Sequence, residues 1–321
     1  RDATAKVTPA DVNKAAATYF VRDNRAVGVF IPDDKPQRAP YMETPKLADV
    51  LKNATFKEEG AVSEAFDVSQ ANIDARTEVL EINGVKTALL PKKTRGETVT
   101  VLTHFNYGTL ETVKGKRALD TLIEPMLTRG AEGMDRTAIS DKLTQLKVQG
   151  DILTFTTTRE NVVAVIELLG KLTSESTFPE KEVNQIVRQM TTMLEGKSDD
   201  PVTLRRDALL KHFATYPEGD PRNRLTSRET LAAVKTVTRD ELYAWYKNAV
   251  ATTHGEVAVV GDFDKNAVKA ALTKALGAKK PADKATDFVR YWADYKPVAA
   301  ERIVIDTPAK ENAVLLARID F

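Results

Sequence analysis

The pattern of apolar and polar positions changes character several times along the chain. Within residues 77–280, short stretches in which apolar and polar side chains alternate indicate strands, because successive side chains of a strand point to opposite faces. Longer stretches with apolar residues three and four positions apart indicate amphipathic helices. The predicted strands span residues 78–82, 86–90, 98–107, 152–158 and 257–260, and the predicted helices span residues 115–128, 137–145, 161–172, 180–195, 201–213 and 265–276.

The first two predicted strands are separated by Asn83 and Gly84, a dipeptide that strongly favours a two-residue hairpin. Several strands together with long helices predict an α+β fold. Its architecture would be a two-layer sandwich, with helices on one face of a mostly antiparallel sheet. Residues 77–280 are therefore interpreted as one complete domain.

One helix–strand pattern occurs twice, with an offset of 230 positions. Residues 7–12 (Val-Thr-Pro-Ala-Asp-Val) align without a gap on residues 237–242 (Val-Thr-Arg-Asp-Glu-Leu), and in both copies a threonine is placed to cap a helix. The apolar stretch 26–31 then aligns with the strand at 257–260. Coincidence between two common capped helices is the alternative, but duplication explains the gap-free match better. It predicts that residues 1–32 form the C-terminal tail of a preceding, similar domain.

Two regions have weak patterns and are interpreted as connectors. Prolines 32, 36, 40 and 45 interrupt the start of residues 33–76, where only a short helix at 46–52 is expected. A structureless loop of roughly 40 residues is improbable inside a compact domain, so we interpret 33–76 as a linker. Residues 281–321 begin as a connector. They then carry strand patterns at 301–306 and 313–320, which we interpret as the first strands of a truncated final domain.

Composition limits the function classes without choosing among them. The chain has 321 residues with 47 Lys plus Arg against 46 Asp plus Glu, and a net charge of +1 argues against bulk nucleic-acid binding. It contains no cysteine, so disulfides and zinc–thiolate sites are excluded. No apolar stretch approaches the ~20 residues of a membrane span. No signal peptide is visible at the start of the sequence.

Six segments, in this order, resemble the pitrilysin/insulinase-type zinc metallopeptidases, the inverzincins. The most specific is the strand end Val-Val-Gly-Asp-Phe at 259–263 with the helix before it. The segments are residues 109–118, 121–130, 178–182 leading to 198–201, 216–221, 238–242 and 257–263. Single segments are weak signals, but six in the family's order over most of the chain are a strong one.

The resemblance implies a metallopeptidase-like (LuxS/MPP-type) fold and a larger molecule of two related halves. Each half has two similar domains; one half carries zinc, and the other is often degenerate and encloses the substrate. Residues 1–32 would end the second domain, 33–76 would link the halves, and 77–280 would be a complete third domain. Residues 281–321 would begin the fourth.

The family's zinc motif is His-x-x-Glu-His on a helix, where the two imidazoles bind the metal and the glutamate activates water. On this sequence the ligand positions become Thr121 and Pro125, and the base position is kept as Glu124. The downstream ligand would fall near Thr192 or Met193, with Glu195 close but out of register. Threonine and proline cannot replace imidazole, so we predict no catalytic, cofactor-binding or metal-binding residue in this segment. Glu124 is a relic base or, as we favour, a solvated or capping carboxylate.

Other candidates favour structural roles. His104 is expected to be a packed or surface residue. His212 is expected to interact with a helix C-terminus, and His254 is expected to be exposed in a turn. Asp199 and Asp200 precede Pro201 and favour a helix start over a carboxylate pair. Residues 152–158 are either an ordinary strand or, less favoured, an exposed edge that takes up peptides.

The leading hypothesis is a segment of a zinc metalloendopeptidase, a hydrolase of the insulinase family that degrades peptides or unfolded proteins in a two-half chamber. This segment would be the non-catalytic scaffold and substrate-enclosing half, predicted inactive and without its own cofactor. Zinc would lie in the catalytic half, on the same chain or in a paired subunit. The resemblance implies a periplasmic location. The alternative is a non-enzymatic structural or assembly paralogue on the same fold.

Overall fold

The computed structural model describes residues 6–29, 32, 35, 44–47, 52, 63–282, 287–294, 296–307 and 313–318. The chain divides into two compact units, residues 1–58 and 59–321. The helix expected at residues 46–52 lies mostly outside the described residues.

The first unit contains the capped helix that the sequence predicts. Helix α1 (Pro9–Tyr19) begins with a capping box, in which Asp11 N donates to Thr8 Oγ1 at 3.3 Å and Thr8 N donates to Asp11 Oδ2 at 2.9 Å. A short 3₁₀ helix, η2 (Arg22–Asn24), follows. The strand expected at residues 26–31 is wrong for its described part, because residues 25–29 join no sheet. A strand is stabilised by its neighbours, and the described part of this unit offers none.

The second unit contains a six-stranded sheet among its described residues, with the order β1-β2-β8-β3-β7-β6. Every pairing is antiparallel except that of β2 with β8, which is parallel. Asn83 and Gly84 have φ angles of 51° and 84°, as a type I′ hairpin turn requires. The strands are β1 (Glu78–Ile82), β2 (Val85–Pro91), β3 (Thr98–Phe105), β6 (Gln149–Gly150), β7 (Thr154–Thr158) and β8 (Gly255–Gly261).

The helices of this unit match the predicted ones to within a few residues where a prediction was made. Sequence patterns missed α3, α9, the short 3₁₀ helix η3 (Arg95–Glu97) and three two-residue strands: β4 (Gly130–Ala131), β5 (Met134–Asp135) and β6. The helices are α3 (Gln70–Arg76), α4 (Arg117–Leu127), α5 (Arg136–Gln145), α6 (Val162–Ser174), α7 (Glu180–Glu195), α8 (Pro201–His212), α9 (Ser227–Lys235), α10 (Arg239–Asn248) and α11 (Lys265–Ala275).

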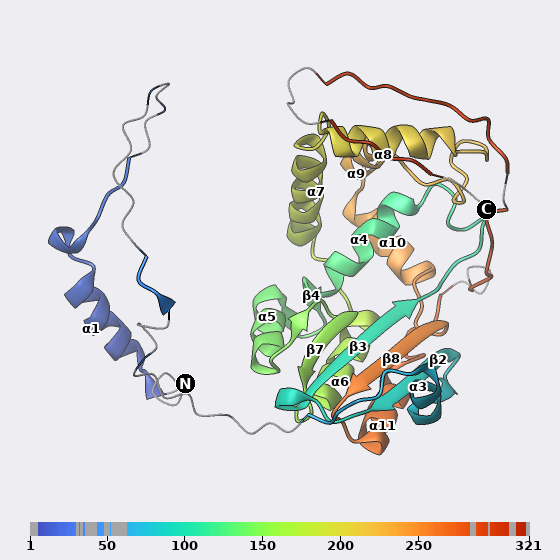
Figure 1. Ribbon diagram of the computed structural model, residues 1–321. Coiled ribbons are helices and arrows are strands. Elements are labelled where there is room, and N and C mark those ends of the chain that lie inside the picture. Colours follow the sequence, from blue (N-terminus) through green and yellow to red (C-terminus); the bar gives the residue numbers. More distant parts are fainter. Residues whose placement is uncertain are drawn as a thin grey trace. The chain divides into compact units, whose positions relative to one another are not determined.

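The core lies between the helices and one face of the sheet. Leu89, Val259 and Val101 lie side by side on β2, β8 and β3, and all three are fully buried. Helices α6 and α11 pack together against this sheet (Figure 1). Gly170 permits their close approach, since a Cβ there would lie 2.8 Å from Ala275 Cα. The α+β sandwich predicted from the sequence is confirmed.

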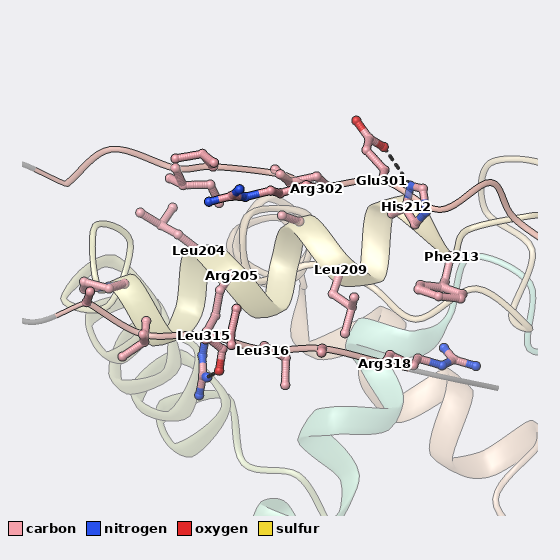
Figure 2. A pocket seen from close by; sticks show the side chains of 18 of the residues that line it. Leu204, Arg205, Leu209, His212, Phe213, Glu301, Arg302, Leu315, Leu316 and Arg318 are labelled. Carbon is pink, nitrogen blue, oxygen red and sulfur yellow. Dashed lines mark hydrogen bonds and ion pairs between the residues drawn. The ribbon is translucent and has the colours of Figure 1, made fainter.

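The strands expected at residues 301–306 and 313–320 are wrong for their described parts. Residues 301–307 and 313–318 form no sheet, and instead run extended along opposite sides of α8 (Figure 2). Two contacts hold these segments on α8. His212 Nδ1 lies 3.0 Å from Glu301 Oε2, and Arg205 Nη1 donates to Leu315 O at 2.7 Å. These residues, which carry an alternating apolar pattern, are therefore extended but pair with no strand among the described residues.

Candidate functional site: the frame of the zinc motif on α4

Helix α4 carries the positions that the sequence resemblance aligns with the zinc motif of the pitrilysin/insulinase-type peptidases. Its apolar side chains Leu122, Ile123 and Met126 are buried, so the helix is fixed on the core and the intervening positions face outward. Thr121 is exposed, and its Oγ1 donates to Arg117 O at 2.9 Å. Pro125 lies inside the helix, which continues to Leu127. Neither ligand position therefore offers a metal-binding side chain.

Glu124 lies on the outer face of α4 near Asp151 and His104. Burial raises the pKa of the Glu124 carboxyl, the charge of Asp151 and a hydrogen bond with it raise this pKa further, and His104 opposes the shift. Asp151 belongs to the turn between β6 and β7, where its Oδ1 accepts from Leu153 N at 2.9 Å and Thr154 N at 2.7 Å. The group comes from three distant segments; Glu124 is exposed, in keeping with the expected solvated carboxylate, and its neighbours Asp151 and His104 were not expected.

This arrangement does not resemble a zinc centre. Among the described residues, no three His, Asp or Glu side chains gather as metal ligands. The residues at the motif positions thus do not fit a zinc ion. The absence of a cofactor from this segment stays a prediction.

A buried polar network fixes α4 from the inner side. Tyr107 Oη and Trp245 Nε1 both donate to Asp120 Oδ1 at 3.0 Å. Burial raises the pKa of the Asp120 carboxyl, while the two hydrogen bonds and Arg117 lower it in part. Burial, the charge of Asp120 and their hydrogen bond hold the pKa of Tyr107 well above its usual range. The network links α4 to α10 and to the segment after β3, and no sequence motif indicates it.

The proposed downstream positions are occupied by residues with other roles. Thr192 and Met193 are exposed on α7. Glu195 pairs with Lys235 of α9 at 2.6 Å, so its carboxylate joins two helices.

Of the three histidines, His104 and His254 lie near each other at the adjoining ends of β3 and β8, since Phe105 pairs with Gly255, whereas His212 belongs to α8. His104 is exposed on β3, and His212 lies in the last turn of α8, where Nε2 is 2.9 Å from Ala299 O. His254 was expected to be exposed in a turn, and its side chain is 39% exposed. Its Nδ1 is 3.5 Å from Asp287, and its ring lies 5.7 Å from that of Phe288.

Two further sequence hypotheses are decided by the structure. Asp200 caps α8, since its Oδ2 accepts from Thr203 N at 3.0 Å, and Pro201 begins the helix as predicted. For residues 152–158, the sheet order places β7 between β3 and β6 rather than at the edge, although β6 pairs only with Phe155 and Thr156.

Two cavities lie away from the α4 frame. The larger, about 1020 Å³, follows α8 between the extended segments 298–307 and 313–318 (Figure 2). The smaller, about 450 Å³, lies between the start of α4, the end of α8 and the loop 216–226. No described helix has the length and apolar character needed to cross a membrane.

The chain matches no protein-family model and no curated protein. Among solved structures, it is similar to a peptidase M16 inactive domain from Pseudomonas fluorescens. The two are 17% identical with a TM-score of 0.52, over 70% of this chain and 54% of that one. The first half of the periplasmic protease PqqL from Escherichia coli is also 17% identical, with a TM-score of 0.53 over 70% and 50% of the two chains.

A third similar structure is the ferredoxin protease FusC, solved in complex with Arabidopsis ferredoxin. It is 11% identical with a TM-score of 0.52, over 66% of this chain and 25% of that one. The chain spans about half the length of the first two structures, with 54% and 50% covered. At these identities, the similarity to the solved structures shows the fold alone. This fold is that of M16-type peptidase domains, and one of the similar structures is an inactive domain. The resemblance indicated by the six motifs is confirmed at this level.

Proposed function

We propose that this chain is the non-catalytic half of a zinc metalloendopeptidase and helps to enclose peptides or unfolded proteins in a chamber. One observation carries the proposal. The chain has an M16-type fold, and on the helix aligned with the zinc motif Thr121 and Pro125 stand where histidines would bind the metal. Catalysis and zinc would then belong to a catalytic half, on the same chain or in a paired subunit.

The domain organisation follows from the same proposal. Residues 1–32 would end a preceding domain, 33–76 would link the halves, and 77–280 would be the complete inactive domain. Residues 281–321 would begin a final one. The protein substrate seen with FusC supports peptides or proteins as the enclosed class, and the periplasmic PqqL supports the same compartment here. Nucleic acid and membrane are not expected partners.

The test is reconstitution with a zinc-bearing half of the same protein or a paired subunit. Cleavage of a quenched fluorescent peptide is measured for the catalytic half alone, for this chain alone and for the mixture. We expect no cleavage and no stoichiometric zinc for this chain alone, and at least about a tenfold gain for the mixture, or about 1.4 kcal/mol. A stable complex with unchanged cleavage would instead favour the alternative, a non-enzymatic assembly paralogue. Cleavage by this chain alone would refute both.

A ligand-restoration variant tests the alignment of the zinc frame. Thr121→His with Pro125→His recreates His-x-x-Glu-His, whose i and i+4 imidazoles share one helix face. We expect this double variant to retain zinc in equilibrium dialysis, whereas Thr121→Ala with Pro125→Ala retains none. If the two variants bind zinc equally poorly while both remain folded, α4 is not the counterpart of the zinc helix.

A further inference from the structure

The smaller cavity combines a positive wall with an apolar wall. Its volume of about 450 Å³ falls within the roughly 300–1,000 Å³ typical of small-ligand sites. Its walls come from three parts of the fold: the start of α4, the end of α8, and the loop 216–226 leading into α9. The apolar lining includes Ala118, Leu210, Ala214, Leu225 and Ala233.

Three basic side chains line the cavity, each from a different element. Arg117 begins α4, Lys211 lies in the last turn of α8, and Arg224 belongs to the loop. Arg117 Nη2 donates to Pro221 O, which is an uncharged acceptor. Lys211 and Arg224 form no ion pair with any residue that the structure describes. Lys211 and Arg224 are therefore held by no short ion pair, although the charge of Lys211 acts on Glu229 and that of Arg117 acts on Asp120.

Two of the three acidic residues that line the cavity are already engaged. Asp220 accepts from Arg222 at 2.9 Å (Nε to Oδ1) and 2.7 Å (Nη2 to Oδ2), and these bonds lower the pKa of Asp220 to about 2. Glu229 Oε2 accepts from both the N and the Oγ1 of Thr226 at 2.7 Å in a capping box. The third, Glu218, is exposed. The three basic side chains thus share the cavity with three acidic ones, of which Asp220 is neutralised by Arg222.

A buried donor in the same wall lacks a partner. Arg117 Nε is fully buried and makes no hydrogen bond. An unmade hydrogen bond of a buried charged group costs free energy, and such a group calls for an explanation such as an unseen acceptor. The cap residue of α4, Lys116, provides no side-chain hydrogen bond to the first turn either.

We propose that this cavity binds the C-terminal carboxylate of a peptide whose last side chain is apolar. Arg117, Lys211 and Arg224 would hold the carboxylate, and the side chain would pack against Leu210 and Leu225. A peptide is favoured over another amphipathic carboxylate because the proposed function provides peptides; in this respect alone the inference rests on that function. Bound product or substrate ends would then be held at a point distinct from the α4 frame.

The experiment measures binding of a fluorescein-labelled peptide ending in leucine to the full chain, by fluorescence anisotropy. Two forms are compared, one with a free C-terminal carboxylate and one with a C-terminal amide. We expect the carboxylate form to bind at least about tenfold more tightly, because charged hydrogen bonds to the basic wall are lost in the amide. Arg224→Gln and Lys211→Gln should each weaken the carboxylate form about fivefold. Lys142→Gln, an exposed lysine on α5, is the matched control and should change nothing.

Arg224 and Lys211 are exposed, so the variants should remain folded, which circular dichroism checks. Equal binding of the carboxylate and amide forms would overturn the proposal, as would unchanged binding by both variants. Decanoate, an amphipathic carboxylate without a peptide, should compete only weakly; tight decanoate binding without peptide binding would refute the peptide as ligand. The reconstitution assay is separate. Loss of the cleavage gain with retained carboxylate binding would contradict the proposed function and leave the cavity's specificity standing.

Discussion

Two copies of one sequence pattern have opposite environments in this molecule. Helix α10 and strand β8 repeat α1 and residues 25–29 at an offset of 230 positions. Both helices form, and both begin with a threonine capping box. Yet α10 buries Leu242, Trp245 and Tyr246, whereas α1 buries none of its residues among those described.

The strand halves of the two copies differ even more. Val257 and Val259 are 2% and 0% exposed in β8, which lies between β2 and β3. Their counterparts Val27 and Val29 are 67% and 77% exposed and join no sheet. Capping and helix periodicity are local and act in both copies. A strand needs hydrogen-bonded neighbours, and among the described residues only the second copy has them.

The largest expected difference between the copies comes from a charge on the strand. Val259→Asp would bury a carboxylate between Leu89 and Val101 with no partner. We expect it to lower the free energy of unfolding by about 3–5 kcal/mol, the usual cost of an uncompensated buried charge. Val29→Asp should change it by less than about 0.5 kcal/mol, as for most surface substitutions. Guanidinium unfolding followed by far-UV circular dichroism measures both. A similar loss in the two variants would mean that residues 25–29 are buried in solution.

The helix halves give a somewhat smaller contrast. Leu242 is fully buried and its counterpart Val12 is 56% exposed. Leu242→Ala should cost about 2–5 kcal/mol through lost burial and a cavity. Val12→Ala should cost less than about 0.5 kcal/mol. Calorimetry of both variants and the wild type measures the two losses of stability. Comparable costs would show that α1 packs on a partner under the conditions used.

Trp245 also donates a hydrogen bond to Asp120, whereas its counterpart in α1, Ala15, has no side-chain donor. Asp120→Ala would leave Trp245 Nε1 and Tyr107 Oη without their acceptor. We expect a cost of about 1–3 kcal/mol, typical of unsatisfied buried donors. Asp120→Asn keeps an acceptor oxygen and is the matched control, expected to be milder.

The buried carboxyl of Asp120 also predicts that the stability of the protein depends on pH. Burial raises the folded-state pKa of Asp120 above that of an unfolded aspartate, which is about 3.9. Such a carboxyl contributes stability at pH values below its unfolded pKa and loses that contribution as the pH rises through its folded pKa. Relative to Asp120→Asn, the wild type should therefore lose stability from about pH 4 toward neutrality. Urea unfolding of both proteins across this range measures the difference; a difference that grows in the opposite direction would contradict the burial argument.

Much of the second unit could be predicted from local signals. The Asn83–Gly84 turn set the first hairpin, and helical periodicity placed α7 at residues 180–195 as observed. The failures have physical causes. Residues 301–306 carry a strand pattern but no partner among the described residues. Strand β6 has only two residues and is defined by its pairing with β7 rather than by its sequence.

The candidate site was predictable only in part. The motif frame identified Thr121, Glu124 and Pro125 on one helix, because their spacing is local. Asp151 joins Glu124 through the β6–β7 turn, and the basic wall of the smaller cavity combines α4, α8 and a loop. Such groups depend on chain segments brought together by the fold. No spacing rule in a single sequence reports them.

The caps provide the smallest and most discriminating comparison, because both copies share them in structure. Thr238→Ala and Thr8→Ala each remove the side-chain acceptor for the N–H three residues later. Each should cost its helix about 1 kcal/mol. In α10 this cost should lower the global free energy of unfolding, since the helix is packed in the core. In α1 it should appear only as faster amide exchange over residues 9–19, with an unchanged unfolding midpoint of the second unit. An unfolding transition of the second unit that shifts equally with Thr8→Ala would show that helix formation in α1 is coupled to the core, and that the two copies differ less than their exposures indicate.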